Sequence, residues 1–525
     1  MTTSPYSKEN LSVGIKHFLL GRGLAGLAGF ATVVLLVRFM TVEHYAAYTA
    51  LTGVIVLAGI IAGLGFERAI SRYVPEGRLD RQAPELGRFI WIIALIRLTA
   101  AIIICLAVYA GWHWVLAIFR DVTLKEFPLA LACFVLAETL FQYFSSVMQA
   151  LVLQKTLTQL MVVQWAGRLL LILMFVWQQS QINLEDSLWI MAIPEMLGVI
   201  GFVLVLLNYL KKLSATQTEN IKNQHHVTWP NWHDVWQLSL HNYGFTLLAA
   251  PPQGYFMKML AAAFLPTQMV AAYGFFLSVA ERLRQYIPLH LLYNLIEPVM
   301  IASYLQDKNF KMLSYRSQLL YKSNLLLMVP VIAWIAVAGP QIISLLTGGK
   351  FQEYTWILLV VFIQLTIGSH VVLLQLILNS VNSSVVLVRA GFWALIVMAI
   401  ATVLACLVDI RALILGPTVF SLVCNLYVLN QIKKLKLNYA FSWQMLLGIV
   451  VAGTISAIFS YWSLSITHIA TLQSVWLALV TGLIVLITYA LSLPVLKAVS
   501  MSEIHLVKSF FVRKPATLKQ VLSHE

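Results

Sequence analysis

Charged residues are scarce in this chain, and their scarcity excludes most soluble folds. Asp, Glu, Lys and Arg make up 11% of the 525 residues, whereas soluble domains carry roughly 25%. Hydrophobic residues make up 60% of the chain, and its mean hydropathy is +0.83. The apolar runs are continuous and about twice the ~10-residue length of a transmembrane β-strand. The sequence therefore predicts an all-α integral membrane protein with many spans.

Cysteine motifs, nucleotide loops and catalytic constellations are also missing. The four cysteines lie inside apolar runs without CxxC spacing, and no histidine pair has metal-protease spacing. Gly348-Gly349-Lys350 is the one P-loop candidate, but Ser344 stands where such a loop needs its first glycine. We therefore expect no metal, no ATP site, no cofactor and no enzyme activity. The net charge of +14 belongs mostly to loops facing anionic lipid and does not indicate nucleic acid.

The first long apolar stretch, His17 to Met40, is suited to close helix packing inside a bilayer. Gly21, Ala25 and Gly29 recur every four residues and leave one helix face almost bare, so that a neighbouring backbone can approach. Arg22 lies beside this face, inside the membrane, where a guanidinium in lipid is costly. It either snorkels to the near interface or faces a polar interior. The stretch is too long for the core of a cleavable signal, so we expect it to be retained.

Fourteen apolar stretches predict fourteen transmembrane helices. With a cytoplasmic N-terminus, the cytoplasmic segments hold 23 of the 35 Lys and Arg residues and the outer loops hold four. This asymmetry follows the positive-inside rule, and it predicts that both termini are cytoplasmic. The predicted spans are 17–40, 45–66, 87–110, 125–150, 158–177, 187–210, 236–262, 268–291, 323–346, 355–380, 384–408, 411–432, 440–463 and 473–496.

A weak internal repeat predicts two lobes of the same orientation. FMTVEHYAAY, from Phe39, matches FLPTQMVAAY, from Phe264, at four of ten positions and at a constant offset of 225 residues. Each copy joins an odd span to an even one, which is typical of lobes related by an axis along the membrane normal. Pro251 and Pro252 must break or kink the seventh span, as a simple kink or as a hinge. We predict an N-lobe (1–225, spans 1–6), a C-lobe (226–435, spans 7–12), two further spans (436–496) and a basic cytoplasmic tail (497–525).

Ionisable residues recur near the middle of the predicted spans, where they either mark a pathway or pair with one another. Adjacent spans could pair Arg97 with Glu138, or Arg168 with Glu195. Alternatively, an excess of cations forms a basic cavity for an anionic cargo, since arginine binds phosphate through a planar fork. Lys258 lies close enough to a span end to snorkel. The cavity candidates are Arg22, Arg97, Arg168, Arg282 and Arg284, and the coupling-ion candidates are Glu138, Glu195 and Glu281.

Three stretches resemble the Wzx-like polysaccharide and O-antigen flippases of the multidrug/oligosaccharidyl-lipid/polysaccharide (MOP) exporter superfamily. They are LLVRFMTVEHYAAYTAL (35–51), LGFERAISRYVPE (64–76) and LLTGGKFQEYTWILLVVF (345–362). The resemblance implies export of an undecaprenyl-pyrophosphate-linked oligosaccharide across the bacterial inner membrane, by alternating access, for lipopolysaccharide or exopolysaccharide synthesis. It also implies an ion gradient or membrane potential as the driving force, and a polysaccharide polymerase or export protein as a partner.

In the related peptidoglycan-precursor flippases, arginines on spans 1 and 8 line the cavity, and Arg22, Arg282 and Arg284 occupy comparable spans here. By the same resemblance, spans 13 and 14 accommodate the prenyl tail. Two other functions stay open: a drug or small-metabolite antiporter of the same fold, which would favour an acidic cavity, and a non-transporting membrane component of a polysaccharide assembly complex.

Overall fold

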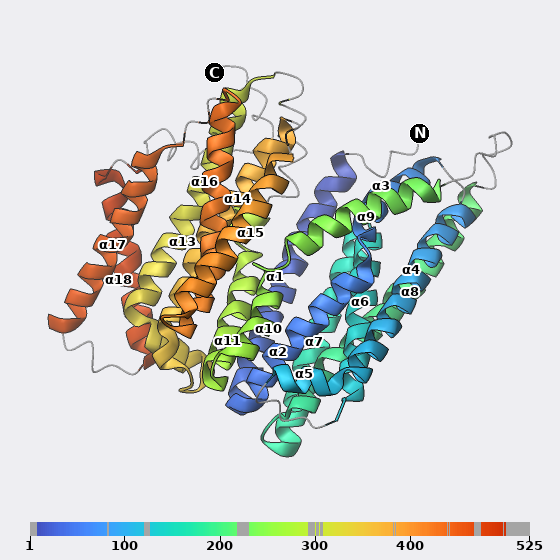
Figure 1. Cartoon of the computed structure of the whole chain (residues 1–525), viewed down its shortest axis with the longest axis horizontal. Coiled ribbons are helices and arrows are strands. Elements are labelled where there is room, and N and C mark those ends of the chain that lie inside the picture. Colours follow the sequence, from blue (N-terminus) through green and yellow to red (C-terminus); the bar gives the residue numbers. More distant parts are fainter. Residues whose placement is uncertain are drawn as a thin grey trace. The chain divides into compact units, whose positions relative to one another are not determined.

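A computed structural model describes residues 8–80, 83–119, 126–217, 230–291, 308–381, 385–437, 441–466 and 474–496, together with residues 300, 304, 383, 439, 498 and 499. Throughout these ranges the regular structure is helical (Figure 1). The predicted all-α class is therefore confirmed. The chain forms two compact units, which we describe separately: unit 1 (residues 1–283 and 388–423) and unit 2 (residues 284–387 and 424–525). The predicted lobe boundaries stay a prediction.

Most helices of unit 1 come from the first half of the chain. They are α1 (Lys8–Phe39), α2 (Val42–Gly63), α3 (Phe66–Asp80), α4 (Ala83–Ala110), α5 (Trp112–Ile118), α6 (Leu129–Ala150), α7 (Gln154–Gln179), α8 (Leu184–Gln217), α9 (Trp232–Leu248), α10 (Gly254–Phe264), α11 (Thr267–Arg284), α15 (Val385–Cys406), η2 (Ile410–Leu415) and the first part of α16 (Gly416–Lys434).

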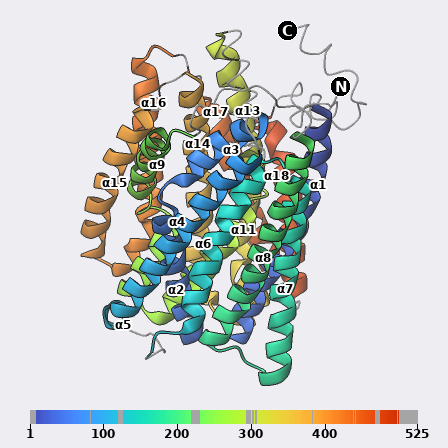
Figure 2. The same cartoon turned by 90° about the vertical axis from the view of Figure 1, so that its right-hand side faces the viewer.

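Helix α6 lies at the centre of unit 1. It packs against α8, α2, α4 and α3, while α1 packs along α7 and α10 packs along α2. Figure 2 shows α4, α6 and α8 beside one another. Their buried side chains form one apolar core, which includes Phe89, Tyr143 and Phe202. Helix packing in unit 1 thus leaves the inward faces of α2, α6, α7 and α8 close together.

The number of spans is not confirmed as fourteen. Eleven described helices are long and apolar enough to cross a membrane, and α1 contributes a shorter apolar segment, Gly23–Phe39. Each predicted span nevertheless coincides with helix. The seventh is divided into α9 and α10, with turns around Pro251-Pro252. The eighth, α11, is only 18 residues long and ends in Glu281, Arg282 and Arg284. Short length and terminal charge explain why these segments escape a criterion based on hydropathy.

Residues 67–86 join the second and third predicted spans, and the first part of this connection is helical. Helix α3 covers Phe66 to Asp80, and its buried residues recur with helical spacing: Phe66, Ala69, Ile70, Tyr73 and Val74. Gly65 precedes it with φ +74°, and a Cβ there would lie 2.1 Å from the Ser239 carbonyl oxygen on α9. Only glycine fits both the positive φ and this close approach.

The residues that directly follow the two copies of the predicted repeat contact each other. Thr49 and Gly274 are 225 residues apart, as the repeat requires, and a Cβ at Gly274 would lie 2.1 Å from Thr49 Oγ1. Nearby, a Cβ at Gly53 would lie 2.6 Å from the Tyr255 carbonyl oxygen. Equivalent residues that contact each other lie beside a twofold axis. The parallel repeat of the two lobes stays a prediction.

Unit 2 is built around a long helix. Its helices are α13 (Phe310–Thr347), η1 (Gln352–Tyr354), α14 (Thr355–Ser380), the end of α16, α17 (Trp443–Ile466) and α18 (Ser474–Val495). Helix α13 packs against α14, α17 and α18. Gly348 and Gly349 follow α13 with φ of +69° and +93°, and the Gly349 amide donates to the Ser344 carbonyl oxygen (3.0 Å). These glycines therefore form a helix C-cap.

Candidate functional site

A cluster of ionisable and aromatic side chains lies inside unit 1. Its members come from five helices, and half of them are buried while the others are partly buried. An ion pair and two cation–π contacts join Glu195, Arg168, Trp165 and Arg282. We call it the charged cluster, and it consists of Tyr48 on α2, Glu138 on α6, Trp165 and Arg168 on α7, Glu195 on α8, and Arg282 on α11.

Arg168 and Glu195 form a buried ion pair between α7 and α8. The Arg168 Nη2 group donates to Glu195 Oε1, and the Gln164 amide donates to the same oxygen at 3.1 Å. Arg168 is 4% exposed and Glu195 is 2% exposed. Two ions this far from water are tolerated only when each neutralises the other. The sequence-predicted pairing of these two residues is therefore present.

Two guanidinium groups contact the indole ring of Trp165. The Cζ atoms of Arg168 and Arg282 each lie 4.2 Å from the ring centroid. Such cation–π contacts are worth about 0.5–2 kcal/mol each. Gly29 on α1 lies beside Arg282, because a Cβ there would be 3.4 Å from Arg282 Nε. Arg282 forms no ion pair with any residue in the described ranges. It is only partly buried, so it retains donors for a ligand.

Glu138 lies next to Glu195. Its Oε1 atom accepts a hydrogen bond from the Gln142 amide at 2.5 Å. The register of α6 and α8 explains this neighbourhood. A Cβ at Gly198, three residues after Glu195, would lie 2.6 Å from the ring of Phe141, three residues after Glu138. The bare surface at Gly198 thus lets α6 and α8 pack closely beside these two residues.

The alternative pairing of Arg97 with Glu138 is wrong. Arg97 on α4 is fully buried, and its Nη1 atom lies 2.9 Å from Glu67 Oε1 on α3. The guanidinium also lies 5.6 Å from the Tyr143 ring centroid. Its partner was missed because Glu67 lies between two predicted spans, outside the segments that were searched for buried charges. A Cβ at Gly63 would come within 3.0 Å of both charged groups, so glycine leaves room for this pair.

The remaining charges of α10 and α11 are arranged differently from the expectation. Lys258 was expected to snorkel, but it is buried, and its Nζ atom lies 3.6 Å from Glu281 Oε2 and 3.4 Å from Ser278 Oγ. Glu281 is half-exposed and adjoins Gly254 at the start of α10, where a helix N-terminus favours a carboxylate. Arg284 ends α11 and is exposed. The side chain of Arg22 lies outside the described residues.

Unit 2 contains a polar cluster without an ion pair. His370 on α14 contacts Asn425 Oδ1 through Nδ1 (2.9 Å) and the Tyr439 hydroxyl through Nε2 (3.2 Å). Asn425 Oδ1 can only accept, so Nδ1 carries the proton and Nε2 accepts from Tyr439. The ring also lies 4.7 Å from that of Tyr321. Burial raises the pKa of the Tyr439 hydroxyl, which lies between α16 and α17. These hydrogen bonds hold α16 and the segment that follows it against α14.

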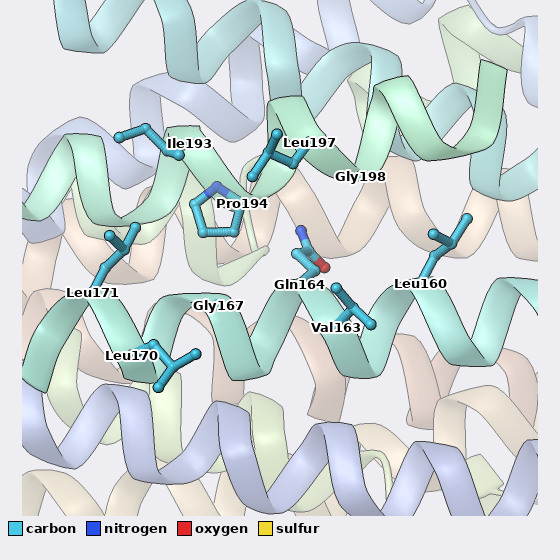
Figure 3. A pocket seen from close by; sticks show the side chains of 10 residues that line it. All are labelled: Leu160, Val163, Gln164, Gly167, Leu170, Leu171, Ile193, Pro194, Leu197 and Gly198. Atoms are coloured by element: carbon cyan, nitrogen blue, oxygen red, sulfur yellow. The ribbon is translucent and has the colours of Figure 1, made fainter. Parts of the chain in front are cut away.

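An apolar groove of about 300 Å³ runs between α7 and α8 (Figure 3). Leucines dominate its walls, and Gly167 and Gly198 keep it open. Gln164 is the amide in its lining, and it projects from α7 towards α8 (Figure 3). Since Gln164 donates to Glu195, the groove lies directly beside the charged cluster. Within the described residues no group of three His, Cys, Asp or Glu could hold a metal ion.

Comparison with solved structures identifies the fold. The lipid II flippase MurJ, in an inward closed conformation, matches 90% of this chain and 97% of its own, with a TM-score of 0.65 and 13% identity. An inward-facing multidrug resistance MATE transporter of the MOP superfamily matches 81% of this chain and 100% of its own (TM-score 0.56, 14% identity). A mutant of the Vibrio cholerae MATE transporter VcmN matches 81% and 98% (TM-score 0.51, 16% identity).

The chain thus has the fold of the MOP superfamily, as its motifs indicated. Residues 14–273, just under half of the chain, match the family model of the polysaccharide biosynthesis proteins. This segment covers α1 to α10 and the start of α11. No curated protein matches the sequence.

Several members of the site were missed by sequence reasoning. Trp165 and Gln164 stand one helical turn from Arg168, and this spacing alone could have indicated a shared face. Tyr48 lies in the repeat motif, which was interpreted only as a sign of duplication. Glu67 has no comparable signal, because its contact with Arg97 depends on the turn at Gly65.

Proposed function

We propose that this protein is a flippase that moves an undecaprenyl-pyrophosphate-linked oligosaccharide from the cytoplasmic to the outer leaflet of the bacterial inner membrane. The polysaccharide biosynthesis match and the MOP fold support a role in making cell-surface polysaccharide, such as O-antigen or exopolysaccharide. In this proposal the protein carries out transport without a chemical step. An ion gradient or the membrane potential drives it, and both termini are cytoplasmic.

The observation that carries the proposal is the state of Arg282. Glu67 neutralises Arg97, Glu195 neutralises Arg168, and Glu281 neutralises Lys258. Arg282 has no carboxylate at ion-pair distance among the described residues, and Trp165 fixes its guanidinium. A partly buried guanidinium held in place without a counter-ion suits a phosphate, which accepts two parallel hydrogen bonds from its planar fork.

In this proposal each part of the cluster has a role. Arg282 binds the pyrophosphate, and Trp165 keeps its side chain in one orientation, so that less entropy is lost on binding. Arg168 adds positive potential, while Glu195 fixes it in place. The break at Pro251-Pro252 acts as a hinge between α9 and α10. Arg22 and Arg284 are further cavity candidates, and α17 and α18 accommodate the prenyl tail.

The test is loss of the gene product, followed by analysis of lipid-linked intermediates. We expect undecaprenyl-linked repeat units to accumulate on the cytoplasmic side, and plasmid-borne wild type to clear them. Arg282→Gln should fail to clear them. Arg389→Gln, which removes an exposed arginine from α15, should clear them as wild type does. Unchanged glycolipids together with altered drug resistance would favour a MATE-like antiporter. If every variant of an ionisable residue within the spans clears the intermediates as wild type does, a non-transporting component of an assembly complex would be favoured.

A further inference from the structure

The apolar groove between α7 and α8 opens on the surface of unit 1 (Figure 3). Val163, Leu170 and Leu197 on its rims are 67%, 67% and 63% exposed. Both helices are long and apolar enough to cross a membrane, so the medium that meets these rims is lipid and not water. A hydrocarbon chain fills a groove on such a surface, because an empty groove would forfeit dispersion contacts along its walls.

Two glycines and a proline let α7 and α8 approach closely at the floor of the groove. A Cβ at Gly167 would lie 3.4 Å from the Pro194 Cβ atom, and a Cβ at Gly201 would lie 2.8 Å from Leu160 Cδ2. The volume of about 300 Å³ holds about ten groups as large as a water molecule (~30 Å³ each), and a methylene group is of similar size. The groove therefore has room for one extended chain.

Two exposed lysines lie beyond one end of the groove, Lys155 on the first turn of α7 and Lys211 near the end of α8. Arg78 shows that these helix ends adjoin, since it donates to the Leu151 carbonyl oxygen and its Cζ atom lies 5.7 Å from the Tyr209 ring centroid. These two contacts lie four residues before Lys155 and two residues before Lys211. Neither lysine forms an ion pair with a described residue.

The lysines are placed at the depth of a lipid head group. Leu197, Leu204 and Lys211 are exposed and recur every seven residues, so the rim of the groove and this lysine share one face of α8. On α7 the groove begins about 7.5 Å after Lys155 and reaches Gly167 about 18 Å after it, at 1.5 Å per residue. Half of the hydrocarbon core is ~15 Å. A chain whose head group lies at the lysines therefore reaches the middle of the bilayer inside the groove.

We propose that the α7–α8 groove binds one chain of an anionic phospholipid, and that Lys155 and Lys211 bind its phosphate head group. Each lysine supplies three hydrogen-bond donors and no acceptor, which suits a phosphate. The bound chain also keeps water from Gln164, which lies in the lining and donates to Glu195 Oε1 at 3.1 Å. The proposal does not depend on the proposed function, which assigns the prenyl tail of the transported lipid to α17 and α18.

The site is located with a phosphatidylglycerol that carries a photoactivatable diazirine in one acyl chain, added to the purified full-length protein in detergent. We expect mass spectrometry to find cross-links on the segments of α7 and α8 that line the groove. Excess unlabelled phosphatidylglycerol should suppress them, whereas phosphatidylcholine with the same chains should suppress them only weakly. Cross-links spread evenly over all spans, or equal suppression by the two lipids, would overturn the proposal.

The contribution of the lysines is measured by native mass spectrometry with phosphatidylglycerol. The double variant Lys155→Gln with Lys211→Gln should bind about 30-fold more weakly, because each lysine near an anionic head group contributes about a factor of five. Lys433→Gln with Lys434→Gln changes two exposed lysines at the end of α16 and should bind as wild type does. Equal binding by the two double variants would overturn the assignment of the head group.

The groove itself is tested by filling it. Val163→Trp enlarges an exposed rim residue, so the protein should fold normally and bind phosphatidylglycerol weakly. Leu173→Trp, at an exposed position of α7 outside the groove, should bind as wild type does. Unchanged binding by a folded Val163→Trp protein would overturn the groove as the site. Displacement of phosphatidylglycerol by an equal amount of undecaprenyl pyrophosphate would overturn the phospholipid as the occupant, and would leave the proposed function standing.

Discussion

The different surroundings of Arg168 and Arg282 predict opposite consequences for two equivalent substitutions. Arg168→Gln leaves Glu195, which is 2% exposed, without its counter-ion. Breaking a buried pair in this way costs about 3–5 kcal/mol, a large share of the ~5–15 kcal/mol that stabilises a folded protein. Arg282→Gln removes only a cation–π contact with Trp165, which is worth about 0.5–2 kcal/mol.

The assay compares protein and function for each variant. Folded protein is measured by fluorescence-detected size exclusion and by thermal unfolding in detergent, and function by clearance of lipid-linked intermediates. We expect Arg168→Gln to lose folded protein and function together. Arg282→Gln should keep near-normal protein and lose function.

A rescue separates the loss of charge balance from the loss of a ligand contact. The double variant Arg168→Leu with Glu195→Leu removes both ions, and such apolar replacements are often neutral or stabilising by about 1–4 kcal/mol. It should therefore recover folded protein. Two results would refute the reasoning: a fully stable Arg168→Gln protein, or an Arg282→Gln protein that is destabilised as much as Arg168→Gln.

Three further predictions concern packing and polar contacts. Gly274→Ala should cost about 1–3 kcal/mol, because its Cβ would overlap Thr49, and adding Thr49→Ala should recover part of the loss in a thermal unfolding assay. Glu67→Gln should lower the unfolding temperature by leaving Arg97 buried without a counter-ion, at a cost of about 1–3 kcal/mol. His370→Leu should lower the free energy of unfolding by a similar ~1–3 kcal/mol, because it removes the hydrogen-bond partner of Asn425 and of the Tyr439 hydroxyl.

Each of these has a matched comparison. Gly391→Ala, where a Cβ would meet nothing within 4 Å, should leave stability nearly unchanged, and equal damage from both glycine variants would contradict the packing argument. Glu185→Gln controls for the loss of a carboxylate at Glu67. If the hydrogen-bond assignment is correct, the His370→Asn protein should be more stable than the His370→Leu protein. Equal stability of the two variants would contradict the assignment.

The helices could be predicted from the length of the apolar stretches, since a segment that crosses a bilayer must form its backbone hydrogen bonds within itself. Pro251 and Pro252 lie where the helix breaks, because proline removes a donor and clashes with the preceding turn. Helix α3 was missed because hydropathy was applied to a segment whose signal is helical periodicity.

Pairing of charges was harder to predict, because it depends on the register between helices. Glu195 was matched correctly with Arg168 on the preceding helix. Arg97 was assigned to the wrong carboxylate, because its real partner lies beyond the turn at Gly65. The same limit applied to Trp165, whose contact with Arg282 joins residues more than a hundred positions apart.

The most direct test of the central claim is binding of undecaprenyl pyrophosphate to the purified protein by native mass spectrometry. Wild type and Arg389→Gln should bind with equal affinity. Arg282→Gln should bind about 10- to 100-fold more weakly, which corresponds to the ~1.5–3 kcal/mol of a hydrogen bond to a charged group. Equal binding by a folded Arg282→Gln protein would contradict the account.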